Sequence, residues 1–303
     1  MITVITPSYN RAHTLGKCYD SLCSQTDKRF TWVIIDDGSQ DHTKEMVDTW
    51  IQEKMIAIEY YYKENGGKAS ALNYGLDHLK SEYVVCLDSD DYFFPDAIEH
   101  AIHELTEIKD RTDLCGILAI RHTPDGNIMG GKQIPQEYDT ITAGDFFSKL
   151  KLGKAELICF YKSEIIKKYR FPVIKNERFI SPAWMQYKIS KDYPYKTSWH
   201  KYCCCEYLTD GLTKNKRKVI AKNPKGYTCT ISASLEHNQG VVSLLKRAVK
   251  YNYGTLLSGD PNWLADAPRK AAVLITRPLG WLVYLYRRKD DKQYQNALIS
   301  GRK

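Results

Sequence analysis

Three carboxylates follow a short apolar run near residue 90. Residues 84–87 are typical of a buried strand, and Asp88, Asp90 and Asp91 come directly after it. Three carboxylates within four residues repel one another unless a cation offsets their charge. Hard oxygen ligands suit Mg²⁺ or Mn²⁺, and such an ion can also hold phosphate oxygens. The stretch therefore predicts a metal-assisted phosphate site. The alternative is a set of acids that only favours the N-terminus of the helix beginning near Pro95.

Four polar loops each follow a predicted strand in the first hundred residues. The strands, 2–6, 30–35, 56–62 and 84–87, alternate with amphipathic helices. This alternation predicts an α/β fold with a Rossmann-like, mostly parallel twisted sheet and helices on both faces. Right-handed crossovers gather the carboxyl ends of parallel strands at one edge, so we expect the loops to converge on a nucleotide site. Ordinary turn chemistry is the alternative for each loop taken alone.

Two common phosphate-binding motifs are missing from the sequence. The loop after the first strand reads Pro7-Ser8-Tyr9-Asn10-Arg11 and has no glycine, so the dinucleotide motif Gly-x-Gly-x-x-Gly is missing. No Gly-x-x-x-x-Gly-Lys-Ser/Thr occurs either. A metal ion held by Asp90 and its neighbours is then the expected means of binding the phosphates.

The four loops together resemble the family 2 glycosyltransferases of GT-A fold. They read Thr-Pro-Ser-Tyr-Asn-Arg, Ile-Asp-Asp-Gly-Ser-Gln-Asp, Asn-Gly-Gly-Lys-Ala-Ser-Ala-Leu-Asn-Tyr-Gly and Leu-Asp-Ser-Asp-Asp. The resemblance covers about residues 1–120 in order and spacing. A weaker likeness continues to about residue 225 through Arg-Phe-Pro at 170–172, Asn-Glu-Arg-Phe at 176–179 and residues 206–213. The last segment resembles bacterial members that build surface polysaccharides.

The resemblance implies roles for individual residues. Tyr9 would lie against the nucleotide base, and Asp37 would accept a hydrogen bond from a ring N–H such as that of uracil. Asp88 and Asp90 would form the metal-binding Asp-x-Asp, with Asp91 beside them. Asp36 alternates with Asp37 and either contributes to the site or only ties down its loop.

One position departs from the family pattern. Many relatives carry Ala-Arg-Asn where this chain has Ala71-Leu72-Asn73. Lys68 can supply the missing positive charge to a diphosphate, or it is an ordinary solvated lysine. The predicted donor-binding residues are Pro7, Tyr9, Asp37, Lys68, Asp88, Ser89 and Asp90, and the predicted metal ligands are Asp88, Asp90 and Asp91.

An inverting transferase also needs a general base for the acceptor hydroxyl. Relatives often carry a Glu-Asp pair for this role, and this sequence has none. Glu177 is our candidate, and Asp192 is held in reserve. Pro182 stands where some relatives have a second acid. The alternative for Glu177 is a capping or salt-bridged surface acid.

Composition narrows the class of protein. The 303 residues include 44 Lys and Arg against 36 Asp and Glu, a formal charge of +8. Nine irregularly spaced cysteines favour a reducing compartment, the cytosol. No zinc site is expected, because Cys-x-x-Cys is absent and the eight histidines are scattered. Neither a signal peptide nor a spanning segment of ~20 apolar residues is expected.

The C-terminal part differs from the rest of the chain. Residues 211–235 contain no acid but six lysines and arginines, and residues 271–286 are largely apolar between basic clusters. We expect a basic, partly amphipathic helical extension over 213–303, following a nucleotide-sugar half (1–112) and an acceptor half (113–212). Residues 269–289 would lie on an anionic membrane surface, or would fold back on their own domain. No nucleic-acid partner is expected.

The resemblance, together with the acidic stretch, implies a metal-dependent, inverting glycosyltransferase of the hexosyl- or N-acetylhexosaminyl type (EC 2.4). It would use Mn²⁺ or Mg²⁺ and move a sugar from a nucleotide diphosphate donor. Among such donors, a UDP-sugar is the first expectation. The acceptor would be a saccharide or a lipid-linked group in surface polysaccharide synthesis. The expected location is cytoplasmic or peripheral on the inner face of the cell membrane. A nucleotide-sugar-binding protein without turnover and a sugar-phosphate nucleotidyltransferase are the alternatives.

Overall fold

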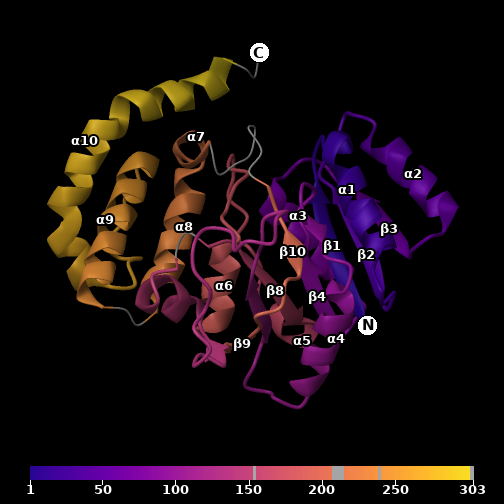
Figure 1. Cartoon of the computed structure of the whole chain (residues 1–303). Coiled ribbons are helices and arrows are strands. Elements are labelled where there is room, and N and C mark those ends of the chain that lie inside the picture. Colours follow the sequence, from indigo (N-terminus) through magenta and orange to yellow (C-terminus); the bar gives the residue numbers. More distant parts are fainter. Residues whose placement is uncertain (153–154, 207–214, 238–239, 301–303) are drawn as a thin grey trace. The chain divides into compact units, whose positions relative to one another are not determined.

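The computed structural model describes residues 1–152, 155–206, 215–237 and 240–300. The chain divides into two compact units (Figure 1). Unit 1 consists of Met1–Arg170 with Asp192–Glu206, and unit 2 of Phe171–Lys191 with Tyr207–Lys303. The predicted boundary between residues 212 and 213 lies outside the described residues.

Unit 1 is built on an eight-stranded sheet with the strand order β3-β2-β1-β4-β8-β6-β9-β7. The strands are β1 (Ile2–Ser8), β2 (Phe30–Asp36), β3 (Ile58–Tyr62), β4 (Tyr83–Cys86), β6 (Gly116–Ile120), β7 (Thr140–Ile141), β8 (Leu157–Lys162) and β9 (Tyr195–Thr197). Strands β1 to β4 are parallel, and β8 runs antiparallel to both β4 and β6. The mostly parallel sheet confirms the predicted fold class.

Helices cover both faces of this sheet. They are α1 (Ala12–Cys23), α2 (Thr43–Glu53), α3 (Lys68–Asp77), α4 (Ala97–Glu107), α5 (Ser163–Ile166) and a π-helix at Asp145–Lys149. Side chains alternate across β1: Val4 joins the core formed with α1, α2 and α4, while Ile5 contacts Gly75 of α3 on the other face. Every residue of β1 is buried, as a central parallel strand requires.

A second, two-stranded sheet lies beside the acidic loop. β5 (Tyr92–Phe93) pairs antiparallel with β10 (Cys203–Cys204), and the backbone N–H of Phe94 donates to the carbonyl of Tyr202 at 3.0 Å. β5 follows Asp91 directly, so this pairing brings the three consecutive cysteines 203–205 next to the acids. All three thiols are buried and unbridged.

Unit 2 is helical. Its helices are α6 (Ala183–Ser190), α7 (Lys216–Lys222), α8 (Pro224–Leu235), α9 (Val241–Ser258) and α10 (Lys270–Ser300). α10 packs along α9 through a small core that includes Tyr251 and Val273. The helical basic extension is therefore confirmed, and α10 folds back on its own unit. Among the described residues, no helix combines the length and the apolar character that crossing a membrane requires.

Candidate active site

The loops after β1 and β2 are tied to each other. The backbone N–H of Asn10 donates to Ser39 Oγ at 2.9 Å, and the N–H of Gln40 donates to Asn10 Oδ1 at 2.8 Å. Asn10 has a left-handed φ of +54°, which asparagine tolerates better than most residues. Tyr9, beside it, is 45% exposed. Its ring is thus open to a stacking partner at the carboxyl end of β1.

Asp37 organises the third loop. Its side chain is 3% exposed and accepts hydrogen bonds from Lys63 Nζ at 2.7 Å and from the backbone N–H groups of Gly66 at 3.0 Å and Gly67 at 2.6 Å. Gly67 has φ +87° and directly precedes α3, so a side chain there would be strained. The carboxylate predicted to contact the base thereby also fixes the loop that leads into Lys68.

Asp36 contacts a different set of partners. It is 1% exposed and accepts from the Tyr60 hydroxyl at 2.6 Å and from the Ser39 backbone N–H at 2.7 Å. These bonds link β2 to β3 and to the loop after β2. The contacts match the loop-tying alternative.

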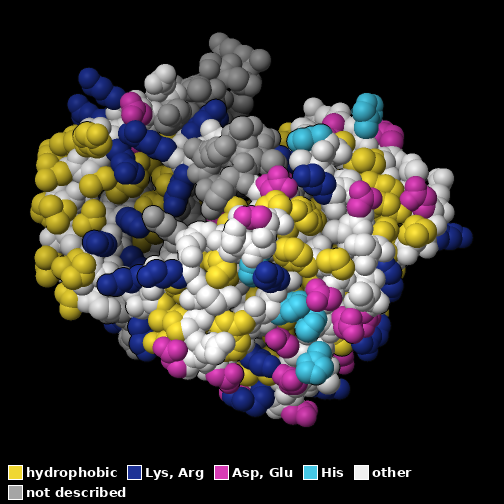
Figure 2. Space-filling view, viewed as in Figure 1, with side chains coloured by type: hydrophobic (Ala, Val, Ile, Leu, Met, Phe, Trp, Pro, Cys, Tyr) yellow, Lys and Arg dark blue, Asp and Glu magenta, His cyan; other side chains and the backbone are white. Residues whose placement is uncertain are grey.

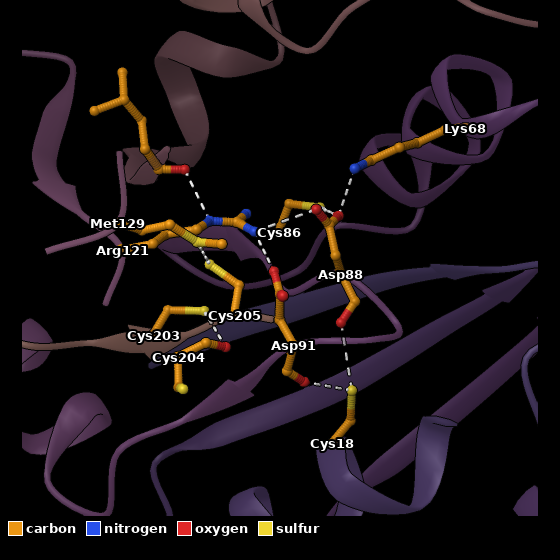
Figure 3. Close-up of polar contacts among 11 residues, drawn as sticks. Cys18, Lys68, Cys86, Asp88, Asp91, Arg121, Met129, Cys203, Cys204 and Cys205 are labelled. Carbon is orange, nitrogen blue, oxygen red and sulfur yellow. Dashed lines mark hydrogen bonds and ion pairs between the residues drawn. The ribbon is translucent and has the colours of Figure 1, made fainter. Parts of the chain in front are cut away.

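Two cations meet the acids at the end of β4 (Figure 3). Lys68 Nζ, from the first residue of α3, lies 2.5 Å from Asp88 Oδ1. Arg121 Nη1, just past β6, lies 3.3 Å from Asp88 Oδ2 and also pairs with Asp91. The Arg121 side chain is 13% exposed and its Nε donates to the Leu157 carbonyl at 3.0 Å. Arg121 is therefore held in place as it bridges two carboxylates.

The two bridged acids have different electrostatic environments. Burial opposes ionisation of Asp88, but Lys68 and Arg121 outweigh it and hold its pKa well below the usual range. Burial raises the pKa of Asp91 to about 7, against the effect of Arg121 and with that of the neighbouring carboxylates. The site thus keeps Asp88 charged through its cations, while burial and the neighbouring carboxylates outweigh Arg121 at Asp91.

Asp90 is the exception among the three acids. Within the described part of the chain it makes no hydrogen bond or ion pair, and its side chain is half-buried. Both of its carboxylate oxygens are therefore available, and such oxygens are the ligands that Mg²⁺ and Mn²⁺ prefer. Asp88 can join as a ligand by exchanging one of its two cations. The donor set fits a divalent ion bound chiefly through Asp90.

The remaining predicted residues lie close to this edge or in the other unit. Ser89 is buried in the turn between Asp88 and Asp91, and Pro7 lies inside β1 opposite Ile35. Glu177 belongs to unit 2. Its two oxygens accept from the backbone N–H groups of Lys225 at 3.0 Å and Gly226 at 2.7 Å, which begin α8.

Glu177 therefore caps α8, which matches the alternative of a capping acid that the sequence left open. Burial raises its pKa, although the two N–H groups oppose the shift. A raised pKa also suits a general base, and the same carboxylate can serve both roles. Asp192, the reserve candidate, accepts from the Tyr169 hydroxyl at 2.8 Å in unit 1.

Sequence reasoning missed Arg121. It ends the apolar run of β6, which runs in the same direction as β4 because β8 is antiparallel to both. A basic residue at the carboxyl end of a buried strand is a usable signal, since that edge gathers ligand-binding groups. The signal becomes specific only when β6 is known to lie two strands from β4.

Comparison with known proteins decides the family. The model of glycosyl transferase family 2 matches residues 3–160, slightly more than half of the chain. The chain belongs to this family. All four loops of the predicted site fall within the matched range, whereas Glu177 and α10 of this family 2 glycosyltransferase lie beyond it.

Curated relatives cover different shares of the chain. A hyaluronan synthase of Pasteurella multocida is 29% identical over 245 residues, which are 80% of this chain and 24% of that protein. A chondroitin synthase of the same species is 35% identical over 130 residues, 43% of this chain and 13% of that protein. A glycosyltransferase of Rickettsia typhi is 38% identical over 118 residues, 38% of this chain and 36% of that protein. The matched region therefore makes up between 13% and 36% of the length of these relatives.

Solved structures share the fold at low identity. TarS 1–349 of S. aureus, in complex with UDP-GlcNAc, has a TM-score of 0.59 and 16% identity, covering 99% of this chain and 92% of that one. The mannosyltransferase PcManGT of Pyrobaculum calidifontis, in complex with GDP-Man and Mn²⁺, has a TM-score of 0.56 and 18% identity, covering 97% and 83%. The likeness shows the GT-A type of fold.

Proposed function

We propose that this family 2 glycosyltransferase is a metal-dependent, inverting enzyme that transfers a hexosyl or N-acetylhexosaminyl group from a nucleotide diphosphate donor. The observation that carries the proposal is the charge arrangement at the end of β4. Asp88 and Asp91 are paired with Lys68 and Arg121, and Asp90 between them has no partner in the described chain. An unpaired carboxylate between two paired acids is free to bind a divalent cation through its oxygens.

Each group at this edge has a distinct task. Mn²⁺ or Mg²⁺ on Asp90, joined by Asp88, would neutralise charge that develops on the departing diphosphate. Lys68 is the first residue of α3, where the helix N-terminus also favours an anion. Arg121 fixes Asp88 and Asp91 in position before the donor binds, because it is anchored on the Leu157 carbonyl. Ser89 keeps the turn between these acids compact.

The donor is proposed to be UDP-linked. Tyr9 offers an exposed ring for the base, and Asp37 offers a buried carboxylate that selects a ring N–H. UDP-GlcNAc in the TarS complex supports this choice, while GDP-Man with Mn²⁺ in PcManGT shows that the fold also accepts a guanine nucleotide. Pro7, buried in β1, gives the loop that carries Tyr9 a rigid start.

The acceptor is proposed to be a saccharide or a lipid-linked saccharide of a surface polysaccharide. The polysaccharide synthases among the relatives support a saccharide. Glu177 is the proposed base for its hydroxyl, with Asp192 in reserve, because burial raises the pKa of Glu177 toward the range a base needs.

We propose that α10 rests on an anionic membrane surface on the cytoplasmic side. Its apolar side chains gather at the left edge of Figure 2, with Lys and Arg beside them. Leu274, Ile275, Leu279, Trp281, Leu282 and Tyr286 are all more than half exposed. Their spacing places them on one face of α10, between Arg269-Lys270 and the basic residues 287–289. An apolar face flanked by cations suits an anionic lipid interface.

The function is tested by UDP release from UDP-sugars with Mn²⁺. Asp90→Asn should lower turnover at least ~10²-fold, because the oxygen ligand loses its charge. Asp113→Asn is the matched control, since Asp113 is an exposed acid of the same unit paired with Arg111. Tight UDP binding without turnover in the wild type would favour a binding protein. Incorporation of nucleotide into a sugar phosphate would favour a nucleotidyltransferase.

The membrane proposal has its own test. Vesicles of phosphatidylcholine with anionic phosphatidylglycerol should retain the wild type, and retention should fall when Leu279 and Leu282 are both changed to serine. Wild-type retention on purely zwitterionic vesicles, or unchanged retention of the double variant, would contradict it. UDP release in free solution should be the same in both proteins.

A further inference from the structure

A second group of metal-ligating side chains lies in unit 1, apart from the acids 88–91. It consists of Asp96 directly before α4, His100 in the first turn of α4, and His200 in the segment between β9 and β10. One ligand atom from each lies within 4.8 Å of the others. His200 Nε2 is 3.3 Å from Asp96 Oδ1, and His100 Nε2 is 3.6 Å from Asp96 Oδ2.

The geometry of these contacts is poor for hydrogen bonds. His200 Nε2 is a buried atom without a hydrogen-bond partner, although Asp96 Oδ1 lies 3.3 Å away. Two ligands bound at about 2.0–2.1 Å in a tetrahedral site lie about 3.4 Å apart. Both measured separations are close to this value. Each nitrogen faces a different oxygen of Asp96, so the three side chains lie within reach of one shared ion after a small rotation of the carboxylate.

The protein fixes the segment that carries His200 without help from an ion. Glu104 of α4 accepts from Ser198 Oγ at 2.9 Å and from the Tyr202 hydroxyl at 2.9 Å, on either side of His200. The backbone N–H of His200 donates to Ser198 Oγ at 3.2 Å. The His100 and His200 rings stack with centroids 3.8 Å apart, so one ring must turn about χ2 before both nitrogens face the same ion. These bonds fix the segment that carries His200, so only side-chain rotations are needed to bring the three ligands onto one ion.

We propose that Asp96, His100 and His200 form a binding site for Zn²⁺ or a chemically similar ion such as Co²⁺. Two imidazoles and one carboxylate suit these ions, whereas Mg²⁺ and Mn²⁺ favour oxygen ligands. Asp96 and His100 are about half exposed, so water can complete the coordination. The site differs from the Asp88–Asp90 pair in ligand chemistry as well as in position.

The ion would strengthen one connection in unit 1. It would join α4 to the segment between β9 and β10, and β10 pairs with β5, which follows Asp91. Binding would therefore stabilise the two-stranded sheet that supports the acidic loop. It takes no part in the transfer reaction, so the inference stands or falls independently of the proposed function.

Calorimetric titration of the untagged, metal-free full chain with ZnCl₂ tests the site. We expect binding near one equivalent and a rise in Tm of roughly 5 °C when Zn²⁺ exceeds its Kd about 100-fold. Co²⁺ should give visible absorption bands on binding the same site. His100→Gln and His200→Gln should each weaken Zn²⁺ binding at least ~10-fold, because each removes one of three ligands.

Two control variants isolate the site. His103→Gln changes an imidazole of the same helix that is 74% exposed and outside the cluster, and it should bind Zn²⁺ like the wild type. Asp90→Asn should lose the Mn²⁺ response in UDP release yet keep the Zn²⁺ titration. Absence of saturable Zn²⁺ binding in the wild type would overturn the inference. So would unchanged binding in both the His100 and His200 variants.

Discussion

The two compact units carry opposite charge. Unit 2 contains 22 lysines and arginines against seven aspartates and glutamates, a formal charge of +15. Because the whole chain has a charge of +8, unit 1 has a charge of −7. The modest net charge of the whole chain thus conceals two strongly charged parts. An acidic unit suits a site for cations and metal-bound phosphates, and a basic unit suits an anionic surface or acceptor.

The units also differ in how their charges are arranged. In unit 1, Asp88 and Asp91 at the end of β4 are largely buried and matched by Lys68 and Arg121. In unit 2, partial burial and the nearby cations Lys216 and Arg247 lower the pKa of Lys250, so like charges are crowded there. Buried charges must be paired within their own unit, whereas crowded surface cations remain available to a ligand.

The largest expected effect on stability tests the paired charges of unit 1. Arg121→Met leaves Asp88 with one cation and Asp91 with none, so we expect the free energy of unfolding to fall by about 3–5 kcal/mol. Urea denaturation with tryptophan fluorescence measures it. Arg111→Met is the control, because Arg111 pairs with Asp113 at the surface and should leave stability unchanged. If the two substitutions lowered the free energy of unfolding equally, the buried pairs of Arg121 would stabilise the fold no more than the exposed pair of Arg111.

Glu177 separates catalysis from capping in unit 2. Glu177→Gln keeps one of the two oxygen acceptors for the start of α8 but removes the base, so turnover should fall at least ~10²-fold with only a small fall in Tm. Glu177→Ala should also lower the free energy of unfolding by ~1 kcal/mol through the lost cap.

The pH profile of the wild type sharpens the same question. Burial raises the pKa of Glu177 above the ordinary value of 4.5. Because a base acts when deprotonated, kcat/KM should rise with pH through a pKa above 4.5. If Glu177→Gln turned over substrate as fast as the wild type, Glu177 would be only a helix cap, and Asp192 would become the candidate base.

Two glycines in helices should respond with opposite sign. An added Cβ at Gly280 of α10 would lie 2.3 Å from Asn252 Cβ of α9, so Gly280→Ala should cost about 1–3 kcal/mol. At Gly16 of α1 nothing lies within 4 Å, so Gly16→Ala should gain about 0.5–1 kcal/mol in helix propensity. Thermal unfolding of both variants checks the close packing of α9 and α10. A stabilising Gly280→Ala would contradict that packing.

The smallest effect concerns the few acids of unit 2. Glu236 accepts from Lys188 Nζ at 2.6 Å and Lys191 Nζ at 3.0 Å. Burial opposes its ionisation, but the two lysines prevail and lower its pKa below 4.5. A lowered pKa stabilises the folded state above pH 4.5, and this contribution is lost as pH falls through the folded-state value. Glu236→Gln should cost under about 1 kcal/mol at pH 7 and less at pH 3. A cost that grows at low pH would refute the ion pairs.

Local patterns in the sequence predicted the N-terminal half of unit 1. The strands at 2–8, 30–36, 58–62 and 83–86 were evident because each is an apolar run followed by polar turn residues. The convergence of their loops followed from the handedness of crossovers. Unit 2 was less predictable, since its helices are defined by packing on one another. The apolar run at 271–286 predicted either a membrane-surface segment or a helix folded back on its own domain. In the structure α10 packs on α9 and also exposes an apolar face.

The sequence by itself determined the acids after β4, the loop motifs that identify the family and the basic character of the C-terminal part, because each is a contiguous run of residues. Tertiary structure alone decided that Arg121 bridges Asp88 and Asp91, that Glu177 caps α8, and that His100 and His200 meet at Asp96. Histidines that look scattered along the chain form a cluster only once β10 pairs with β5. Contacts of this kind join residues far apart in sequence, and no local period or spacing encodes them.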